Sequence, residues 1–582
     1  MKKRNLIVIL LSLIFALSGI FLGACKIVPK NNDVQPEPDQ ETYAKITEDD
    51  FLTANGKYLY NAKGEMVSLR GVNLGGWLHM EGWMDGGGQD YTYGVDGGHF
   101  MNHFAVLTAL GDRFTEEERE RLLETYQNNY IQKSDLEYLR SLNLNYVRVP
   151  FFWTEIMDFD GNIRDNAFDQ LDWVIKECKD LGMYVLLDLH GSVGGHSGGW
   201  LTGGHWNSNE LWTNESYRLK TEQIWRAIAG RYKDEPAVMG YDLLNEPMAP
   251  VEPAELSEYN TNSLYDRFYH VVREVDDNHI IVPEAFVGFD DLKTPEENGW
   301  ENVVYEVHFY DADDKENPAA QQGFINWIVS YLFEKREQYN VPVLFGEYNF
   351  WSAEDAWRTC METLSANGFS WSSWTYKNTS TTKSDNWGYY YNPSVEQVDY
   401  ANDSFDTIAR KWAAYATEKY EKNEFLTEII KECASKSYED PGKEFEPTAM
   451  SMEAYKWDGT DTMYNMFDGN YNTRWANGEL QNGDGNQYIA VYFDNPALLT
   501  GLTLYTPNGD RAENIDIYYK RKNEPWRKLA AAKCSIGRTV ISFEETEISA
   551  LKIVNKTTND SNWWCIHELK FFEKAERAEN NG

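Results

Sequence analysis

The alternation of short apolar segments with helical patterns, which begins near residue 50, limits the possible folds more than any other feature. Eight segments are short and apolar enough to form buried β-strands, namely 67–75, 144–150, 184–190, 238–246, 280–285, 303–310, 342–347 and 369–376. Helical patterns lie between most of them, for example at 168–181, 216–232 and 262–275. Strands that alternate with helices build a parallel sheet, and eight such units predict a (β/α)8 TIM barrel, an α/β fold.

Polar side chains stand where these predicted strands end. They are Arg148, His190, Asn245, Glu246, His308, Tyr310 and Glu347, and the last strand carries Trp371 and Trp374. The chemistry of a TIM barrel takes place at the carboxyl ends of its strands. One buried Arg or His is usually structural, but a full set at one rim predicts an active site.

Two of these residues, Glu246 and Glu347, define the chemistry most closely. They lie in Asn245-Glu246-Pro247 and in Phe345-Gly346-Glu347, each directly after an apolar run. Two carboxyl groups at one rim suit a retaining glycosidase, in which one protonates the leaving oxygen and the other attacks the anomeric carbon. Taken singly, each motif could equally be a helix start or a turn.

The chain from about 50 to 415 resembles glycoside hydrolase family 5, in the large cellulase-type clan. Within that family, the segments 69–77 (LRGVNLGGW) and 188–191 (DLHG) look most like the exo-β-1,3-glucanase group. The residues that the family uses around the −1 sugar all have counterparts here, namely Arg148, His190, Asn245, Glu246, His308, Tyr310, Glu347 and Trp374. The resemblance implies a hydrolase of O-glycosyl bonds that needs no cofactor for catalysis.

The resemblance also implies a role for each residue. Glu347 would be the ionised nucleophile, to which Arg148 and the Tyr310 hydroxyl donate hydrogen bonds. Glu246 would be the acid/base, which holds a proton before glycosyl transfer and then activates water. In a retaining site the two carboxyl groups should lie about 5–5.5 Å apart.

The other residues would bind the substrate. Asn245 would hydrogen-bond the sugar 2-hydroxyl, a contact that strengthens in the transition state. His190 and His308 would orient sugar hydroxyls and the acid/base, and Trp374 would form the floor of the −1 subsite. His190 and His308 stand on different predicted strands without close ligand spacing, so no catalytic metal is expected.

Two long glycine-rich loops leave the linkage and the mode of attack open. The loop at 77–119 and the loop at 191–208, with Trp200 and Trp206, could wall off a pocket or line an open cleft. A pocket favours exo-action on β-1,3-glucan, whereas a cleft favours an endo-β-1,4-glucanase or a β-mannanase. The loop at 377–391, with Trp387, departs from the pattern expected of fungal exo-glucanases.

The C-terminal part reads as a separate all-β domain. After Asp440-Pro441-Gly442 the strand candidates are 488–493, 501–505, 515–519, 540–543 and 550–554, which predict a sandwich. The motifs 466–470 (MFDGN), 473–475 (TRW), 525–526 (PW), 563–564 (WW) and 567–569 (HEL) resemble a discoidin-type, family 32-like carbohydrate-binding module with a jelly-roll fold.

That resemblance implies a structural Ca²⁺ in the module. Asp468, Thr473 and Glu568 offer the oxygen atoms that Ca²⁺ prefers, although the same side chains could simply cap turns. Trp475 and Trp526 are expected in the core of the module rather than on a sugar-binding surface.

The N-terminus resembles a bacterial lipoprotein signal. Lys2, Lys3 and Arg4 precede an apolar stretch at 6–24, and Leu22-Gly23-Ala24-Cys25 resembles a lipobox in which Cys25 is lipidated. An uncleaved membrane anchor is the alternative. The expected domains are a signal peptide at 1–25, a linker at 26–48, the barrel at 49–436, the module at 440–575 and a tail at 576–582.

The net charge of the chain limits the classes of partner that it can bind. With 54 basic and 93 acidic side chains the net charge is −39, which argues against nucleic acid and anionic lipid and suits an uncharged polysaccharide. Contact with a membrane is expected only through the lipid anchor, and the protein is expected to be a monomer. Cysteines 178, 360, 433, 534 and 565 show no metal-ligand spacing, and whether Cys534 pairs with Cys565 is open.

The leading hypothesis is therefore a retaining β-glucan hydrolase, most simply an exo-β-1,3-glucanase, at the outer surface of a bacterial membrane. A glycan-binding lipoprotein without activity is the alternative from another class. It is disfavoured because a decayed active site should have lost at least one of the eight residues. A third hypothesis keeps the enzyme and changes the substrate to β-1,4-glucan, mannan or a glycolipid glucoside.

Overall fold

A computed structural model describes residues 43–85, 102–199, 202, 209–249, 260–286, 288–379, 387–506 and 510–574. All eight predicted barrel strands are present within these ranges. They form nine elements, because the predicted strand 280–285 is divided in two: β4 (Arg70–Asn73), β5 (Tyr146–Phe152), β6 (Tyr184–Gly191), β7 (Val238–Asp242), β8 (Ile280–Val282), β9 (Glu284–Ala285), β10 (Tyr305–His308), β11 (Val343–Glu347) and β12 (Ser370–Ser373).

The parallel sheet closes on itself. Its strand order is β8-β7-β6-β5-β4-β12-β11-β10-β9. The two edge strands β8 and β9 are separated in the chain only by Pro283, whose missing N–H interrupts the ladder. They are therefore two halves of one strand, which pairs with β7 on one side and with β10 on the other. The predicted (β/α)8 TIM barrel is confirmed.

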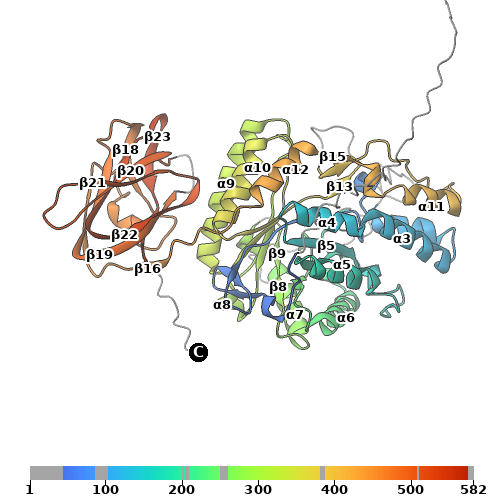
Figure 1. Cartoon of the computed structure of the whole chain (residues 1–582). Helices are drawn as coiled ribbons and strands as arrows, with labels where there is room; N and C mark the ends of the chain where they lie inside the picture. The colour runs from blue at the N-terminus through green and yellow to red at the C-terminus, as the bar shows by residue number, and fades with distance from the viewer. Residues whose placement is uncertain are drawn as a thin grey trace, which may run out of the picture. The chain divides into compact units, whose positions relative to one another are not determined.

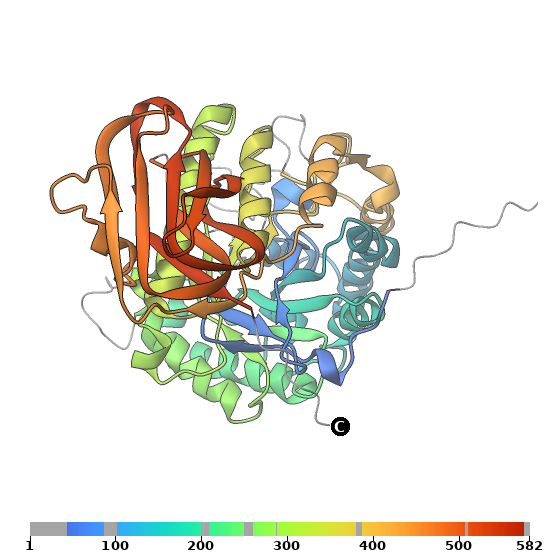
Figure 2. The ribbon, with the colours of Figure 1, turned by 60° about the vertical axis from the view of Figure 1, so that its left-hand side comes forward.

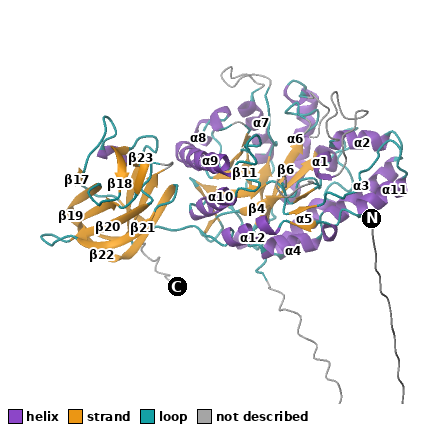
Figure 3. Cartoon of the chain, turned by 90° about the horizontal axis from the view of Figure 1, so that it is seen from above, coloured by secondary structure: helices purple, strands orange, loops and turns teal. Residues whose placement is uncertain are grey.

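Helices surround the strands (Figures 1 and 3). They are α1 (Gly82–Asp85), α2 (His103–Gly111), α3 (Glu116–Tyr130), α4 (Lys133–Ser141), α5 (Asp169–Asp180), α6 (Glu215–Tyr232), α7 (Thr261–Arg273), α8 (Pro295–Asn298), α9 (Pro318–Tyr339), α10 (Glu354–Ala366), α11 (Phe405–Ala413) and α12 (Glu424–Cys433). Several begin at an Asn cap; the Asn260 side chain, for example, accepts from Ser263 N and starts α7. The turned view of Figure 2 shows the same helices outside the strands.

The strands are apolar because both of their faces are covered. Every residue of β5 and β6 is buried, including the polar ones near their carboxyl ends. Part of the tryptophan content serves this core, since Trp77, Trp225, Trp357 and Trp371 are fully buried. Trp371, which the sequence placed among the strand-end residues, donates its indole N–H to Ser365 Oγ and belongs to the core.

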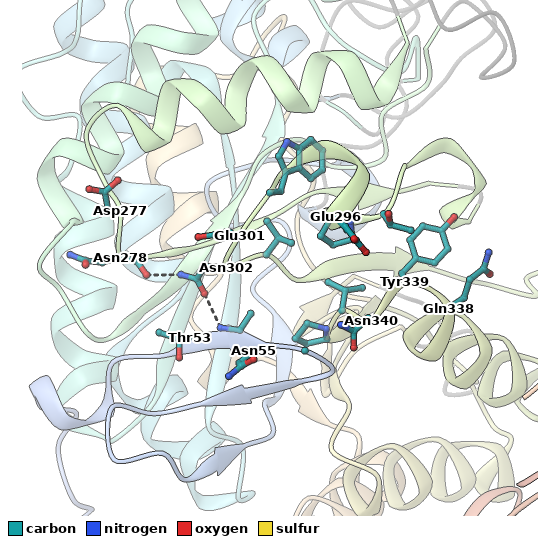
Figure 4. Close-up of a pocket in the computed structure, with 18 of the residues that line it drawn as sticks. Thr53, Asn55, Asp277, Asn278, Glu296, Glu301, Asn302, Gln338, Tyr339 and Asn340 are labelled. Carbon is teal, nitrogen blue, oxygen red and sulfur yellow. Dashed lines mark hydrogen bonds between the residues drawn. The ribbon is translucent and has the colours of Figure 1, made fainter. Parts of the chain in front are cut away.

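An antiparallel three-stranded sheet precedes the barrel, with strands β1 (Thr53–Asn55), β2 (Tyr58–Tyr60) and β3 (Met66–Val67). Between it and the amino ends of β8, β10 and β11 lies a cavity of about 660 Å³ (Figure 4). Asn302 bridges its walls, because its side chain accepts from Ala54 N at 2.8 Å and donates to Asn278 O at 2.7 Å. The cavity lies at the end of the barrel opposite to the predicted active site.

A small sheet of three two-residue strands follows the barrel strands, in the order β13 (Lys377–Asn378), β14 (Tyr390–Tyr391) and β15 (Glu421–Lys422). The C-terminal region is all-β and antiparallel, as predicted. Its strands are β16 (Lys443–Phe445), β17 (Met450–Ala454), β18 (Trp475–Asn482), β19 (Tyr488–Thr506), β20 (Asn514–Lys520), β21 (Arg527–Lys533), β22 (Gly537–Asn555), β23 (Thr558–Ile566) and β24 (Glu568–Glu573). β18 pairs with β23, and the other seven form one sheet.

Two details of the module differ from the prediction. The segments expected as four separate strands form the two long strands β19 and β22, because shifts of register bend each strand without ending it. Trp475 lies in the core against Trp564. Trp526, expected there too, is half-buried on the outer side of the sheet, where Lys520 and Lys552 lie over its ring at 5.0 and 4.6 Å from its centroid.

The cysteines at 178, 360, 433, 534 and 565 are all free and buried, so Cys534 and Cys565 do not pair. Cys25, Trp200 and Trp206 lie outside the described residues, as does the predicted signal peptide. Within the part of the chain that the structure describes, no helix has the length and apolarity that a membrane span requires.

Candidate active site

The structure brings Glu246 and Glu347 to one imidazole. Glu347 is the last residue of β11, and Glu246 follows the end of β7. His308 Nδ1 lies 3.1 Å from Glu246 Oε1 and 3.6 Å from Glu347 Oε2. Because both oxygens contact one nitrogen, they can lie no farther apart than the sum of these distances. The two carboxyl groups therefore lie close together beside His308.

Glu347 is held at both of its oxygens. Arg148 Nη1 donates to Oε1 at 2.8 Å, and the Tyr310 hydroxyl donates to Oε2 at 2.8 Å. These bonds fix the rotamer of the carboxylate and stabilise its charge. Burial raises the pKa of Glu347 to about 7, against the opposing effect of His308 and Arg148 beside it. Burial and Glu347 also hold the pKa of Tyr310 well above its usual value, so the phenol remains a donor.

Glu246 is held through its backbone as well as its side chain. Its φ of 45° lies in the left-handed region, which non-glycine residues rarely adopt. Its N–H donates to Glu284 Oε2 at 2.6 Å, and its carboxyl oxygen Oε1 contacts His308 Nδ1. The turn before Pro247 therefore brings this side chain to His308 instead of continuing the strand.

Arg148 is the centre of a buried ionic network. Besides Glu347, it contacts the carboxylates of Asp188 at 3.1 Å, Asp242 at 2.7 Å and Glu306 at 3.2 Å. Its Nη1 and Nη2 also donate to the amide oxygens Asn73 Oδ1 and Asn245 Oδ1, both at 3.0 Å. A guanidinium offers five N–H groups in a fixed plane, which suits this task better than an ammonium group.

His308 carries a positive charge in this network. Burial acts to lower its pKa, but Glu284, Glu347 and its bonds to Glu246 and Glu306 outweigh that effect and hold the pKa well above the usual value. The imidazolium then donates from Nδ1 to Glu246 and from Nε2 to Glu306 Oε1 at 3.1 Å. Glu306 reaches this place because Gly346 lacks a side chain, and a Cβ there would meet Glu306 Oε1 at 1.6 Å.

His190, Asn245 and Trp374 line the predicted sugar subsite. His190 Nδ1 lies 2.7 Å from Asp188 Oδ2, which leaves Nε2 to face a ligand, and its ring stacks on that of Trp374 at 5.4 Å. Burial, Arg148 and His308 lower the pKa of His190 well below its usual value, so this ring is neutral. Asn245 uses its oxygen on Arg148, so its amide N–H groups can donate to a hydroxyl.

Sequence reasoning missed a group in the segment between the first barrel strand and α1. Glu81 is buried and accepts from the Trp83 indole at 2.9 Å. Burial raises its pKa well above the usual value, and Glu347 and Glu246 raise it further. Its neighbour His79 lies with its ring 4.5 Å from that of His190. A charged residue in the apolar run Leu78-His79-Met80-Glu81 was the signal that could have revealed this group.

Aromatic rings form a wall beside the carboxylates. Trp387 lies 5.4 Å from Tyr310, 5.5 Å from Trp83 and 5.0 Å from Trp351, measured between ring centroids. The sequence drew attention to Trp387 only as a departure from the fungal pattern. Its place next to Tyr310 makes it a part of the candidate site, with a surface on which a sugar ring can stack.

Two groups of donor atoms among the described residues are close enough to hold a metal ion. They are His79, Glu81 and His190, and Glu246, Glu284 and His308, each with donor atoms within 4.8 Å of one another. In the second group the His308 nitrogens already donate to Glu246 and Glu306, and an imidazolium cannot bind a metal. The acid–base chemistry of the two carboxyl groups needs no metal.

In the C-terminal domain, the three predicted calcium ligands are brought together. Thr473 Oγ1 donates to Asp468 Oδ2 at 2.7 Å. Burial and, to a smaller extent, Asp468 raise the pKa of Glu568 to about 8, against the effect of Lys570. Glu568 Oε1 is buried and has no hydrogen-bond partner among the described residues. The carboxyl oxygens of Asp468 and Glu568 repel each other when both are ionised, and a hard cation such as Ca²⁺ would relieve that repulsion.

Comparison with protein families agrees with this geometry. Residues 112–380 match the model of the cellulase family, glycosyl hydrolase family 5. The barrel belongs to glycoside hydrolase family 5. Residues 447–569 match the F5/8 type C domain, so the discoidin-like assignment of the C-terminal domain is confirmed as well.

Individual relatives of this chain carry more specific names. It is 28% identical over 287 residues to a β-xylosidase of Phanerodontia chrysosporium, covering 47% of this chain and 55% of that protein. It is 30% identical over 319 residues to a glucan 1,3-β-glucosidase of Lachancea kluyveri, covering 52% and 66%. A probable glucan 1,3-β-glucosidase A of Neosartorya fischeri is 27% identical over 252 residues, covering 42% and 56%. The chain thus spans 55–66% of the length of these relatives.

Proposed function

We propose that this protein is a retaining β-glucan hydrolase that releases sugars from the ends of β-1,3-glucan chains. The observation that carries the proposal is the contrast between the two carboxyl groups. Glu347 accepts hydrogen bonds from Arg148 and Tyr310, which orient it as a nucleophile. Glu246 receives neither of these bonds and lies near Glu347 on the same His308 nitrogen.

In the first step, a carboxylate oxygen of Glu347 attacks the anomeric carbon. The bond from that carbon to the leaving oxygen breaks, and the proton of Glu246 passes to the leaving oxygen. The Asn245 amide donates to the 2-hydroxyl, and Trp374 lies under the sugar ring. Positive charge that develops on the sugar is stabilised by the carboxylate that attacks it.

In the second step, Glu246 acts as a base. It takes a proton from water while the water oxygen attacks the anomeric carbon, and the ester bond to Glu347 breaks. Two inversions restore the original configuration. During the intermediate, Arg148 and Tyr310 no longer face a charged carboxylate, so they favour the return of Glu347 to its ionised form.

The β-1,3-glucan substrate is supported by the relatives named glucan 1,3-β-glucosidase. The wall of rings around Trp387 suits a sugar substrate of any linkage. The relative named β-xylosidase favours a second candidate, a sugar without a hydroxymethyl group. Endo-β-1,4-glucanase and β-mannanase activity are further outcomes of the test below.

The test uses protein without residues 1–42 on laminarin, carboxymethylcellulose, β-mannan and the aryl β-glucoside and aryl β-xyloside. Glucose as the sole early product from laminarin, with retained configuration by NMR, is the expected result. Glu246→Ala should lose activity and regain it on an activated aryl glycoside with azide. A ladder of oligomers from another polymer would overturn the substrate, and binding without any turnover would favour a glycan-binding lipoprotein.

We also propose that the protein is exported, lipidated at Cys25 and held as a monomer at the outer face of a bacterial membrane. The N-terminal charge, the apolar stretch and the lipobox-like motif support this placement. In the C-terminal domain, Asp468, Thr473 and Glu568 would hold a structural Ca²⁺, which the partnerless Glu568 oxygen supports. Such an ion would stabilise the domain that presents the enzyme to a polysaccharide.

A further inference from the structure

Glu284 is a buried carboxyl group for which the two-carboxylate chemistry has no direct use. It begins β9, directly after Pro283, on the strand that closes the barrel. Its exposed fraction is 0%. Burial raises its pKa well above the usual value, His308 and Arg148 lower it, and Glu246 and Glu306 raise it further. Burying such a group is costly unless its contacts repay the desolvation.

Those contacts hold the acid/base from two directions. Glu284 Oε2 accepts the backbone N–H of Glu246 at 2.6 Å. Glu284 Oε1 lies 3.3 Å from His308 Nδ1, the same nitrogen that contacts Glu246 Oε1 at 3.1 Å. One carboxyl group therefore accepts the backbone N–H of Glu246 and makes an ion-pair contact, without a hydrogen bond, to the imidazole that bonds the Glu246 side chain.

The backbone contact matters because Glu246 has a φ of 45°. A non-glycine residue stays in this region only where its surroundings hold it there. Without an acceptor for its N–H, the Glu246 peptide would be free to turn toward the extended conformation that a residue before proline prefers. That turn would move the carboxyl group away from the leaving oxygen.

Other contacts of Glu284 are weaker. Its distance to Arg148 Nη2 is 4.0 Å, the longest in the network around that guanidinium. The charge of Arg148 is already faced by Asp188, Asp242, Glu306 and Glu347 at 2.7–3.2 Å. Neutralising Arg148 is thus not the main task of Glu284.

From this geometry we infer that Glu284 is the positioning residue of the acid/base Glu246. The inference rests on the proposed function, since it assigns Glu284 to the proton transfer of that reaction. Glu284 itself touches neither substrate nor proton. It places the Glu246 carboxyl group within hydrogen-bonding reach of the leaving oxygen, where general acid catalysis contributes roughly 10²–10⁴-fold.

The informative variant is Glu284→Gln. A glutamine keeps the volume and has one acceptor oxygen, so it can accept the Glu246 N–H or face His308, but not both. Asp276→Asn is the matched control. Asp276 is also a buried carboxyl group that bonds a histidine, His279 Nδ1 at 2.7 Å, but it lies before β8, at the other end of the barrel.

The readout is the ratio of kcat/KM for two aryl β-glycosides of the same sugar, one with a dinitrophenyl and one with an unsubstituted phenyl leaving group. Dinitrophenolate leaves without a proton, whereas phenolate needs one from Glu246. The ratio does not depend on how much of a variant is folded. It therefore separates a positioning role from a purely structural role, and a circular dichroism melt records stability alongside.

We expect kcat/KM of Glu284→Gln to stay within about fivefold of the wild type on the dinitrophenyl glycoside. On the phenyl glycoside it should fall at least about tenfold, because part of the factor that general acid catalysis supplies is lost. Asp276→Asn should leave the ratio unchanged, whatever its melting temperature. An equal loss on both substrates, or none on either, would overturn the positioning role. If the wild type cleaves no aryl glycoside at all, the proposed function fails, and the role of Glu284 fails with it.

Discussion

Arg148 donates a hydrogen bond of 2.8 Å from Nη1 to Oε1 of Glu347, and the donor is completely buried. The same nitrogen also donates to Asn73 Oδ1 at 3.0 Å. Nucleophile, guanidinium and amide therefore form one rigid unit that connects β11, β5 and β4. The position of the nucleophile depends on that unit. Variants of the two residues that donate to Glu347, Arg148 and Tyr310, test this dependence.

Arg148→Lys keeps the charge but not the planar set of donors. We expect kcat/KM to fall by roughly 10²–10³-fold, the usual cost of removing a preorganised donor. The free energy of unfolding should fall by about 1–3 kcal/mol, because buried acceptors such as Asn245 Oδ1 lose their partner. Kinetics and urea unfolding measure the two effects.

Arg336→Lys is the control for this change. Arg336 is also buried, and it donates to Asn367 O at 2.7 Å, away from the carboxyl groups. It should lose stability while the folded enzyme keeps its activity. Equal kinetic losses in both variants would mean that Arg148 has only a structural role.

Tyr310→Phe removes one donor from Glu347 and leaves the other. A hydrogen bond to a charged group contributes about 1.5–3 kcal/mol, so kcat/KM should fall by roughly ten- to a hundredfold. Tyr241→Phe is the control, since the Tyr241 hydroxyl donates to the buried Asp276 Oδ2 at 2.7 Å outside the site. Unchanged kinetics in Tyr310→Phe would show that Arg148 alone orients the nucleophile.

The dependence on pH follows from the burial of Glu347. Its pKa is raised from 4.5 to about 7, and that of Asp188 from 3.8 to about 7, with burial as the largest cause in both. The nucleophile must be ionised, so kcat/KM should rise as the pH increases through about 7. This apparent pKa belongs to the coupled network as a whole.

Stability should change in the opposite direction. Between pH 4.5 and about 7, the folded state keeps the proton of Glu347 that the unfolded state has lost. The free energy of unfolding therefore decreases as the pH rises through this interval. Urea unfolding at several pH values measures the slope, which should be smaller in Glu347→Gln. An equal slope in that variant would remove Glu347 from this effect.

Sequence reasoning succeeded where a local pattern decides the outcome. A buried strand is apolar along its whole length, so each barrel strand was visible from its own residues. Arg148, His190, Glu246, His308 and Glu347 could all be named because each is a polar residue near the end of an apolar run in the sequence. The sequence shows a proline at position 283, but it does not show that β8 and β9, on either side of this proline, close the barrel.

Residues that act through distant partners were missed. Asp242 ends β7, Glu284 begins β9 and Glu306 lies within β10. All three resemble ordinary core acids until the barrel brings them around Arg148 and His308. The left-handed φ of Glu246 depends on Glu284, which lies 38 positions away in the chain. Trp526 was assigned to the core because it is large and apolar, but lysines cover its ring on the outer side of a sheet.

Calcium binding is the last prediction. Asp468, Thr473 and Glu568 should bind Ca²⁺ only when Glu568 is ionised, and its pKa of about 8 means that binding at pH 7 releases a proton. Calorimetry in buffers of different ionisation enthalpy would measure that proton, and the melting temperature of the full chain should rise with Ca²⁺ but not with Mg²⁺.

Asp468→Ala should abolish both effects. Asp484→Ala should not, although Asp484 caps its own loop through Asn486 N at 2.7 Å much as Asp468 does through Asn470 N at 2.9 Å. Equal melting of wild type and Asp468→Ala in Ca²⁺ would show that these three side chains only cap a turn.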